Sequence, residues 1–183
     1  MMTRLEGIGG LDTSALHTFH VQARNNITRA LQLIRKHLDM DVAFISEFSG
    51  DWRYMHYVDA RRDQAPLSIG DQIALQDGYC REIVEGRMPE LIIDTAELPE
   101  AMAIADTHTM PIGAHISVPL RLADGKLFGT FCCFNFTARH DLGDRDLNAL
   151  RKIAEEVARQ IDDSSYDLST SQIESILREN KKS

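Results

Sequence analysis

The chain has 183 residues, a length that suits one ordinary domain with room for a hydrophobic core. Its formal net charge of −8 argues against a nucleic-acid surface, which needs clustered basic residues. No apolar run approaches the roughly 18 residues of a membrane span, and three cysteines are too few for a disulfide framework. We therefore expect a cytoplasmic protein that contacts neither nucleic acid nor a membrane.

Periodicity predicts long helices near both ends of the chain and short strands between them. Apolar residues recur at helical spacing near the N-terminus, and shorter segments then alternate as strands do. The predicted elements are, in order, helix 14–38, strands 40–48 and 52–58, a mostly loop segment 59–76, a short helix 78–85 capped by Asp77, strand 90–94, an irregular or weakly helical segment 95–112, a hairpin 113–135, and a helix from 143 onward.

The hairpin 113–135 has two different faces. Asp124-Gly125 marks its turn, and side chains two apart along each strand share a face. One face is aliphatic. The other face mixes an imidazole, hydroxyls, a thiol and a ring, which belong to His115, Ser117, Thr130, Cys132 and Phe134. A solvent-facing surface would be charged, so the mixed face is predicted to look onto a pocket.

The last predicted helix carries an apolar seam at spacings of three and four, formed by Leu147, Leu150, Ala154, Val157 and Ile161. Such a seam is typical of coiled coils, and we expect the part not needed to cover the sheet to form a parallel homodimer. The predicted fold is α+β. It has a five- or six-stranded antiparallel sheet, the two long helices on one face, and short helices and loops over a pocket on the other.

Three segments between the long helices, DVAFISEF, DGYCREIVEGRMPELIIDT and PIGAHISVPLRLADGKLFGTFCCFNF, resemble GAF domains in that order. The resemblance covers about 14–163, leaving an N-terminal extension 1–13 and a linker with a short C-terminal helix at 164–183. It implies a sensory or regulatory module with a small-molecule pocket in front of the sheet and dimerisation helices behind.

The tail STSQIESILREN is similar to the segment that joins GAF domains to cyclic di-GMP phosphodiesterase domains of the EAL family. That resemblance implies a C-terminal signalling output domain. The other interpretation of the tail is a frayed or dimer-forming terminal helix.

Alternation in the strands, together with the position of the ligand site in the family, predicts one cavity between the sheet and residues 77–112. Its ligand-binding residues are predicted to be Phe44, Ser46, Tyr79, Cys80, Asp94, His115, Ser117, Cys132 and Phe134. No histidine or cysteine spacing predicts a metal site.

Two residues of this set have competing interpretations. Cys80 is either a small buried side chain or a redox switch or covalent ligand anchor. Cys132 shares the pocket face, where it can meet Cys80, whereas Cys133 points the opposite way. His115 is either bonded within the core, or a hydrogen-bond partner of an acidic ligand, or a haem ligand.

The function predicted from these features is a non-catalytic sensory domain that binds a small ligand and signals through its terminal helices. The sequence contains no phosphate-binding loop, dinucleotide fingerprint or nucleophile elbow. The alternatives are a tetrapyrrole or redox sensor using Cys80 or His115, a pure dimerisation scaffold, and a free methionine sulfoxide reductase. A bilin is disfavoured because Arg81, not histidine, follows Cys80; a haem stays open.

Overall fold

The computed structural model describes residues 13–61, 65–162 and 178, so the predicted segments 1–13 and 164–183 lie almost wholly outside the described residues. Its helices and strands are α1 Thr13–His37, β1 Val42–Ser49, β2 Trp52–Ala60, β3 Gln72–Ala74, α2 Tyr79–Val84, β4 Leu91–Ile92, α3 Pro99–Met102, α4 Ala105–Thr109, β5 Ala114–Arg121, β6 Leu127–Asn135 and α5 Asp144–Asp162, with 3-10 helices at Leu75–Asp77 and Thr95–Glu97.

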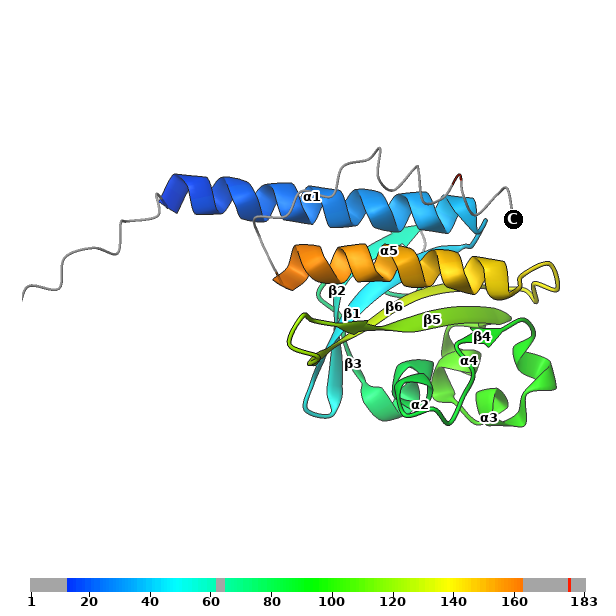
Figure 1. Cartoon of the computed structure of the whole chain (residues 1–183). Coiled ribbons are helices and arrows are strands. Elements are labelled where there is room, and N and C mark those ends of the chain that lie inside the picture. The colour runs from blue at the N-terminus through cyan, green and yellow to red at the C-terminus, as the bar shows by residue number, and fades with distance from the viewer. Residues whose placement is uncertain (1–12, 62–64, 163–177, 179–183) are drawn as a thin grey trace, which may run out of the picture.

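The strands form one six-stranded antiparallel sheet in the order β3-β2-β1-β6-β5-β4. Figure 1 shows the sheet between two layers, with α1 and α5 on one face and α2, α3 and α4 on the other. The predicted α+β fold is therefore confirmed. In the described ranges, no helix is both long enough and apolar enough to cross a membrane.

The core under the long helices contains the aliphatic face of the hairpin. Ile116 and Val118 of β5 pack there with Phe131 and Cys133 of β6. The predicted seam of α5 lies on the same core, and Leu150 within it is fully buried. The seam therefore packs mainly against the sheet of its own chain, as amphipathic helices of globular proteins do. The parallel homodimer stays a prediction for the outward surfaces of the two helices.

The opposite sheet face carries a second core, which contains Phe44 of β1 and both Cys132 and Phe134 of β6. Residues that alternate along β6 thus enter different cores, Cys132 the second and Cys133 the first. The predicted register of the hairpin is confirmed, because a slip of one residue would have exchanged the two faces.

The structure differs from the predictions in three local details. The predicted mostly loop segment 59–76 contains a short strand, β3, which pairs with the start of β2. Asp77 does not cap α2: it ends a 3-10 helix, and Gly78 stands at the N-cap with no side-chain hydrogen bond. Strand 90–94 is reduced to β4, because the Asp94 side chain accepts a hydrogen bond from the Ala96 amide and turns the chain into the next 3-10 helix.

The C-terminal end of α1 is fixed to the loop that leads into α5. Asp39 leaves the helix with a φ of 53°, in the left-handed region that asparagine and aspartate tolerate best after glycine. The Arg139 guanidinium donates to the carbonyl oxygens of Leu38 (3.2 Å) and Asp39 (2.7 Å), and it also pairs with Asp141. One arginine therefore satisfies the helix carbonyls of α1 and holds the approach to α5.

Candidate functional site

Eight of the nine predicted site residues are buried between the sheet and the short helices, six on strands and two on α2. They are buried to 1% exposure or less, and they are Phe44, Ser46, Tyr79, Cys80, His115, Ser117, Cys132 and Phe134. Asp94 does not join them, since its side chain is used to cap a 3-10 helix. The strand alternation therefore predicted which strand residues share this face, whereas Asp94, which was predicted with them, caps a 3-10 helix.

The two predicted pocket thiols are in contact. Cys80 Sγ and Cys132 Sγ are 3.7 Å apart, and neither is in a disulfide. Ser117 Oγ lies 2.9 Å from Cys132 Sγ, and Thr130 Oγ1 lies 3.3 Å from it. Thr130 is in turn 3.1 Å from Ser46 Oγ. Two hydroxyl groups thus contact the sulfur of Cys132, and a third, from Ser46, extends the chain of polar contacts to β1.

Sequence reasoning missed the charged residues of this site. Arg53 of β2 is 1% exposed, forms an ion pair with Asp106 of α4, and places Nη1 3.4 Å from Cys80 Sγ. A Cβ on Gly78 would lie only 2.5 Å from the Arg53 guanidinium, so the start of α2 packs directly on it. The available signal was Arg53 itself, which shares a strand face with the buried Met55.

We call this group of buried residues the polar centre: Arg53, Cys80, Asp106, Ser117, Thr130 and Cys132. The hydrogen bond from Cys132 and the nearby Arg53 charge lower the pKa of Cys80 to about 6, against the opposing effect of burial. Burial and the neighbouring Cys80 raise the pKa of Cys132. Burial also raises the pKa of Asp106, although Arg53 opposes this shift. The polar centre therefore favours a thiolate on Cys80 and a thiol on Cys132.

Tyr79 and His115 lie beside the polar centre as a stacked pair, with ring centroids 4.6 Å apart and planes inclined by 19°. The Tyr79 hydroxyl bonds to Thr107. Two buried nitrogens, Arg53 Nε and His115 Nδ1, have no hydrogen-bond partner among the described residues. A buried polar atom without a hydrogen-bond partner is rare in folded proteins.

His115 should make the stability of the domain sensitive to acid. Burial and the Arg53 charge lower its pKa to about 3, from an ordinary value of 6.5. Above pH 6.5 the imidazole is neutral in both states. As pH falls below that value only the unfolded chain takes up the proton, so the free energy of unfolding should decrease by up to about 1.4 kcal/mol per pH unit through this group.

Urea unfolding at about pH 7.5 and about pH 5 measures this effect. His115→Phe retains a ring against Tyr79 and should lose a large part of the acid sensitivity. His140→Phe, at an exposed position, should respond to acid as the wild type does. Equal acid sensitivity in the wild type and His115→Phe would show that the buried imidazole does not control it.

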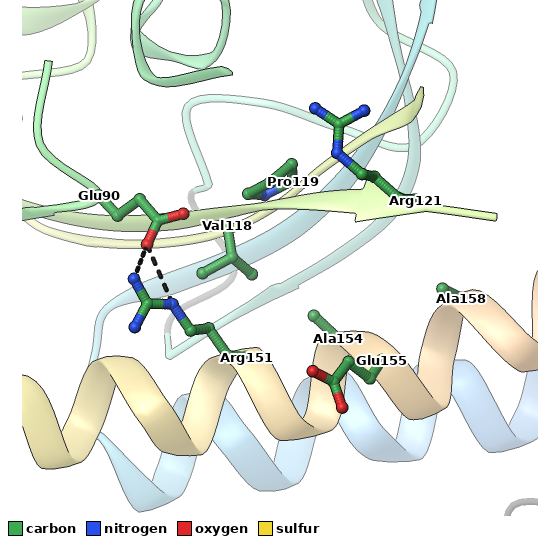
Figure 2. A pocket seen from close by; sticks show the side chains of 8 residues that line it. All are labelled: Glu90, Val118, Pro119, Arg121, Arg151, Ala154, Glu155 and Ala158. Atoms are coloured by element: carbon green, nitrogen blue, oxygen red, sulfur yellow. Dashed lines mark hydrogen bonds and ion pairs between the residues drawn. The ribbon is translucent and has the colours of Figure 1, made fainter. Parts of the chain in front are cut away.

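Open grooves of the surface lie elsewhere. One groove has a volume of about 280 Å³. Figure 2 shows it between β5 and α5, where Arg151 forms an ion pair with Glu90. Its lining residues are Glu90, Val118, Pro119, Arg121, Arg151, Ala154, Glu155 and Ala158. Two others adjoin α1 and β2. None of the nine predicted site residues lines these three grooves, and no metal-binding group of three His, Cys, Asp or Glu residues occurs in the described part of the chain.

A family model described as GAF domain matches residues 25–161. The chain belongs to the GAF domain family. No curated protein matches it.

Solved GAF domains share the fold at low sequence identity. A phycoerythrobilin-bound GAF domain from a cyanobacterial phytochrome is 17% identical, with a TM-score of 0.62, covering 85% of this chain and 97% of that one. The blue-light absorbing PixJ GAF domain of Thermosynechococcus elongatus is 13% identical, with a TM-score of 0.61 and coverages of 81% and 88%. The type II free methionine-R-sulfoxide reductase of Thermoplasma acidophilum is 19% identical, with a TM-score of 0.59 and coverages of 78% and 94%. These likenesses establish the fold alone.

One of these similar structures binds a bilin, which raises the question of whether the site of this GAF domain has room for a tetrapyrrole. Cys80, the candidate anchor, directs its sulfur toward Cys132 and Arg53 inside the polar centre. His115, the candidate haem ligand, is fully buried with its ring against Tyr79. Because these side chains already pack against one another, neither a bilin nor a haem fits this face as it is arranged.

Proposed function

We propose that this GAF domain is a non-catalytic sensory module that binds a small polar molecule at the polar centre. The observation that carries the proposal is the pair of unpartnered buried nitrogens, Arg53 Nε and His115 Nδ1. A buried group without a hydrogen bond costs about 1–3 kcal/mol. A ligand that supplies an acceptor to Arg53 recovers part of that free energy, so a carboxylate, phosphate or carbonyl group is favoured.

Binding at this position is coupled to a change in the layer of short helices. The polar centre is buried, so a ligand reaches it only when the segment around α2 and α4 opens. That segment supplies Cys80 and Asp106, which close over Arg53. Occupancy and the position of these helices are therefore linked, which is what a sensor requires.

The strands supply a route from the polar centre to the long helices. Ser117 and Val118 are neighbours on β5 that enter opposite faces of the sheet, and Cys132 and Cys133 do the same on β6. A shift of either strand at the polar centre thus reaches the packing of α1 and α5. We propose that these helices transmit the signal and form a parallel homodimer; the link to a cyclic di-GMP output module rests on the tail sequence 164–183.

Native mass spectrometry after incubation with a metabolite extract tests ligand binding. The wild type should retain a small molecule that is released on denaturation. His115→Phe should lose it, because the ring nitrogens at this position are removed, and His140→Phe should retain it.

Other results would favour the alternative functions. A wild type that retains no molecule would favour a dimerisation scaffold whose pocket is filled by its own side chains. Visible absorption bands would indicate a tetrapyrrole. Turnover of free methionine sulfoxide that Cys80→Ser abolishes would make the domain an enzyme.

A further inference from the structure

Cys80 and Cys132 are in contact, so their thiols can be oxidised to a disulfide, a reaction that ligand binding does not require. The two sulfurs are 3.7 Å apart, on α2 and β6, and a rotation or small shift of α2 brings them to bonding distance. We propose that the Cys80–Cys132 pair is a redox modification site that a hydroperoxide converts to an intramolecular disulfide. This inference goes beyond the proposed function, because the reaction requires no bound ligand.

The reaction proceeds in two balanced steps. The Cys80 thiolate attacks one peroxide oxygen, so that an S–O bond forms, the O–O bond breaks, and the departing oxygen takes a proton to leave as water or an alcohol. The Cys132 sulfur then attacks the Cys80 sulfenic acid, the S–S bond forms, and hydroxide leaves with the Cys132 proton as water. Two thiols are oxidised by two electrons, and one peroxide is reduced.

The surroundings assign the two sulfurs different roles. Arg53 Nη1 lies 3.4 Å from Cys80 Sγ and stabilises its thiolate, so Cys80 is the attacking sulfur. Its pKa of about 6 agrees with this role. The Ser117 and Thr130 hydroxyls contact Cys132 Sγ, which lies 3.7 Å from Cys80 Sγ, so Cys132 is placed to resolve the sulfenic acid.

The oxidant reaches the two sulfurs when the short helices above them open locally. Both sulfurs are buried beneath α2 and α4, which have only 6 and 5 residues. Helices this short open locally more readily than the central strands of a sheet. Hydrogen peroxide is about the size of water, so a small opening admits it.

Oxidation changes the charge balance of the polar centre. The disulfide removes the Cys80 thiolate, which leaves Asp106 as the counter-charge of Arg53. It also ties the first turn of α2 to β6. The consequence is a domain in which the covering layer is fixed to the sheet in the oxidised form and free to open in the reduced form.

The third cysteine, Cys133, is an internal control for this reaction. Cys133 is as buried as Cys132, but it faces the core under α1 and α5, and burial raises its pKa. A thiol in that environment is unreactive. Cys133→Ser should therefore leave the reaction unchanged.

The experiment treats the folded full chain with hydrogen peroxide, denatures it in N-ethylmaleimide, and maps the peptides by mass spectrometry. The wild type should lose two hydrogen atoms and show one Cys80–Cys132 linkage that dithiothreitol reverses. Cys132→Ser should stop at a sulfenic acid on Cys80 that dimedone traps. Cys80→Ser should form neither product.

The pH profile of the oxidation rate tests the role of Arg53. In the wild type the rate should reach half its maximum near pH 6, the pKa of Cys80. In Arg53→Gln the midpoint should rise toward ordinary thiol values, whereas Arg53→Lys should keep it lower. If Arg53→Gln does not fold, the lysine variant and the cysteine variants still decide the proposal.

Two results would overturn the inference. In the first, all three cysteines of the folded wild type remain open to alkylation after peroxide treatment, although the same treatment oxidises the denatured chain. The other is a linkage that involves Cys133 at a rate comparable with Cys132.

Discussion

Replacing Gly129 by alanine should destabilise the domain by about 3 kcal/mol or more. Gly129 lies in β6 opposite Glu47 of β1, where the strands approach closely. A Cβ at this position would stand 1.9 Å from the Ser46 carbonyl oxygen and 3.0 Å from the Glu47 Cα. Both atoms belong to the backbone, so relief requires the two central strands to separate.

Urea unfolding followed by circular dichroism measures this loss, and Gly143→Ala is the matched control. A Cβ on Gly143 would meet no atom within 4 Å. Its position just before α5 makes alanine a poorer cap, so a change below about 1 kcal/mol is expected. A Gly129→Ala variant as stable as Gly143→Ala would contradict the close strand approach described for β1 and β6.

Removing the charge of Asp106 should produce the second large effect. Asp106→Asn leaves the Arg53 guanidinium buried without a carboxylate, and breaking a buried ion pair typically costs 3–5 kcal/mol. Since Cys80 lies near the same guanidinium, we expect a loss of about 3 kcal/mol, at the lower end of that range. The urea midpoint measures it.

Glu85→Gln is the control, because Glu85 forms exposed ion pairs with Arg81 and Arg87, and exposed pairs add little to stability. The double variant Arg53→Met with Asp106→Asn removes the uncompensated charge, so it should be more stable than Asp106→Asn alone. If Asp106→Asn and Glu85→Gln have equal effects, the buried pair does not hold α4 to the sheet.

Strand alternation predicted the face of the site because it is a local property of the chain. His115, Ser117 and Cys132 were placed on the correct face from their spacing alone, and the contact of Cys132 with Cys80 follows from that placement. Asp94 shows the limit of this reasoning. Nothing in its local pattern distinguished a pocket carboxylate from one that caps a 3-10 helix.

The charged half of the site could not be predicted, because it depends on long-range contacts. Arg53 and Asp106 are 53 positions apart, and the segment that supplies Asp106 was predicted to be irregular. The strand β3, with three residues, is too short to show a periodicity.

The apolar seam of α5 was open to two interpretations for a physical reason. Spacings of three and four place residues on one stripe, whether that stripe meets a sheet or another helix. In this domain the sheet takes most of it, including Leu150 and Val157. The pattern therefore predicted a helix and its buried face, but not the element that buries it.

The anchorage of α1 beside α5 gives the long helices the geometry of a lever. Arg139 holds the end of α1 at Leu38 and Asp39, and Figure 1 shows α5 beginning at that same corner and running back antiparallel. With 25 residues α1 is about 37 Å long, and its N-terminal part projects beyond the sheet. Because its C-terminal end is held by Arg139, any tilt of α1 about that end would displace the Thr13 end farthest.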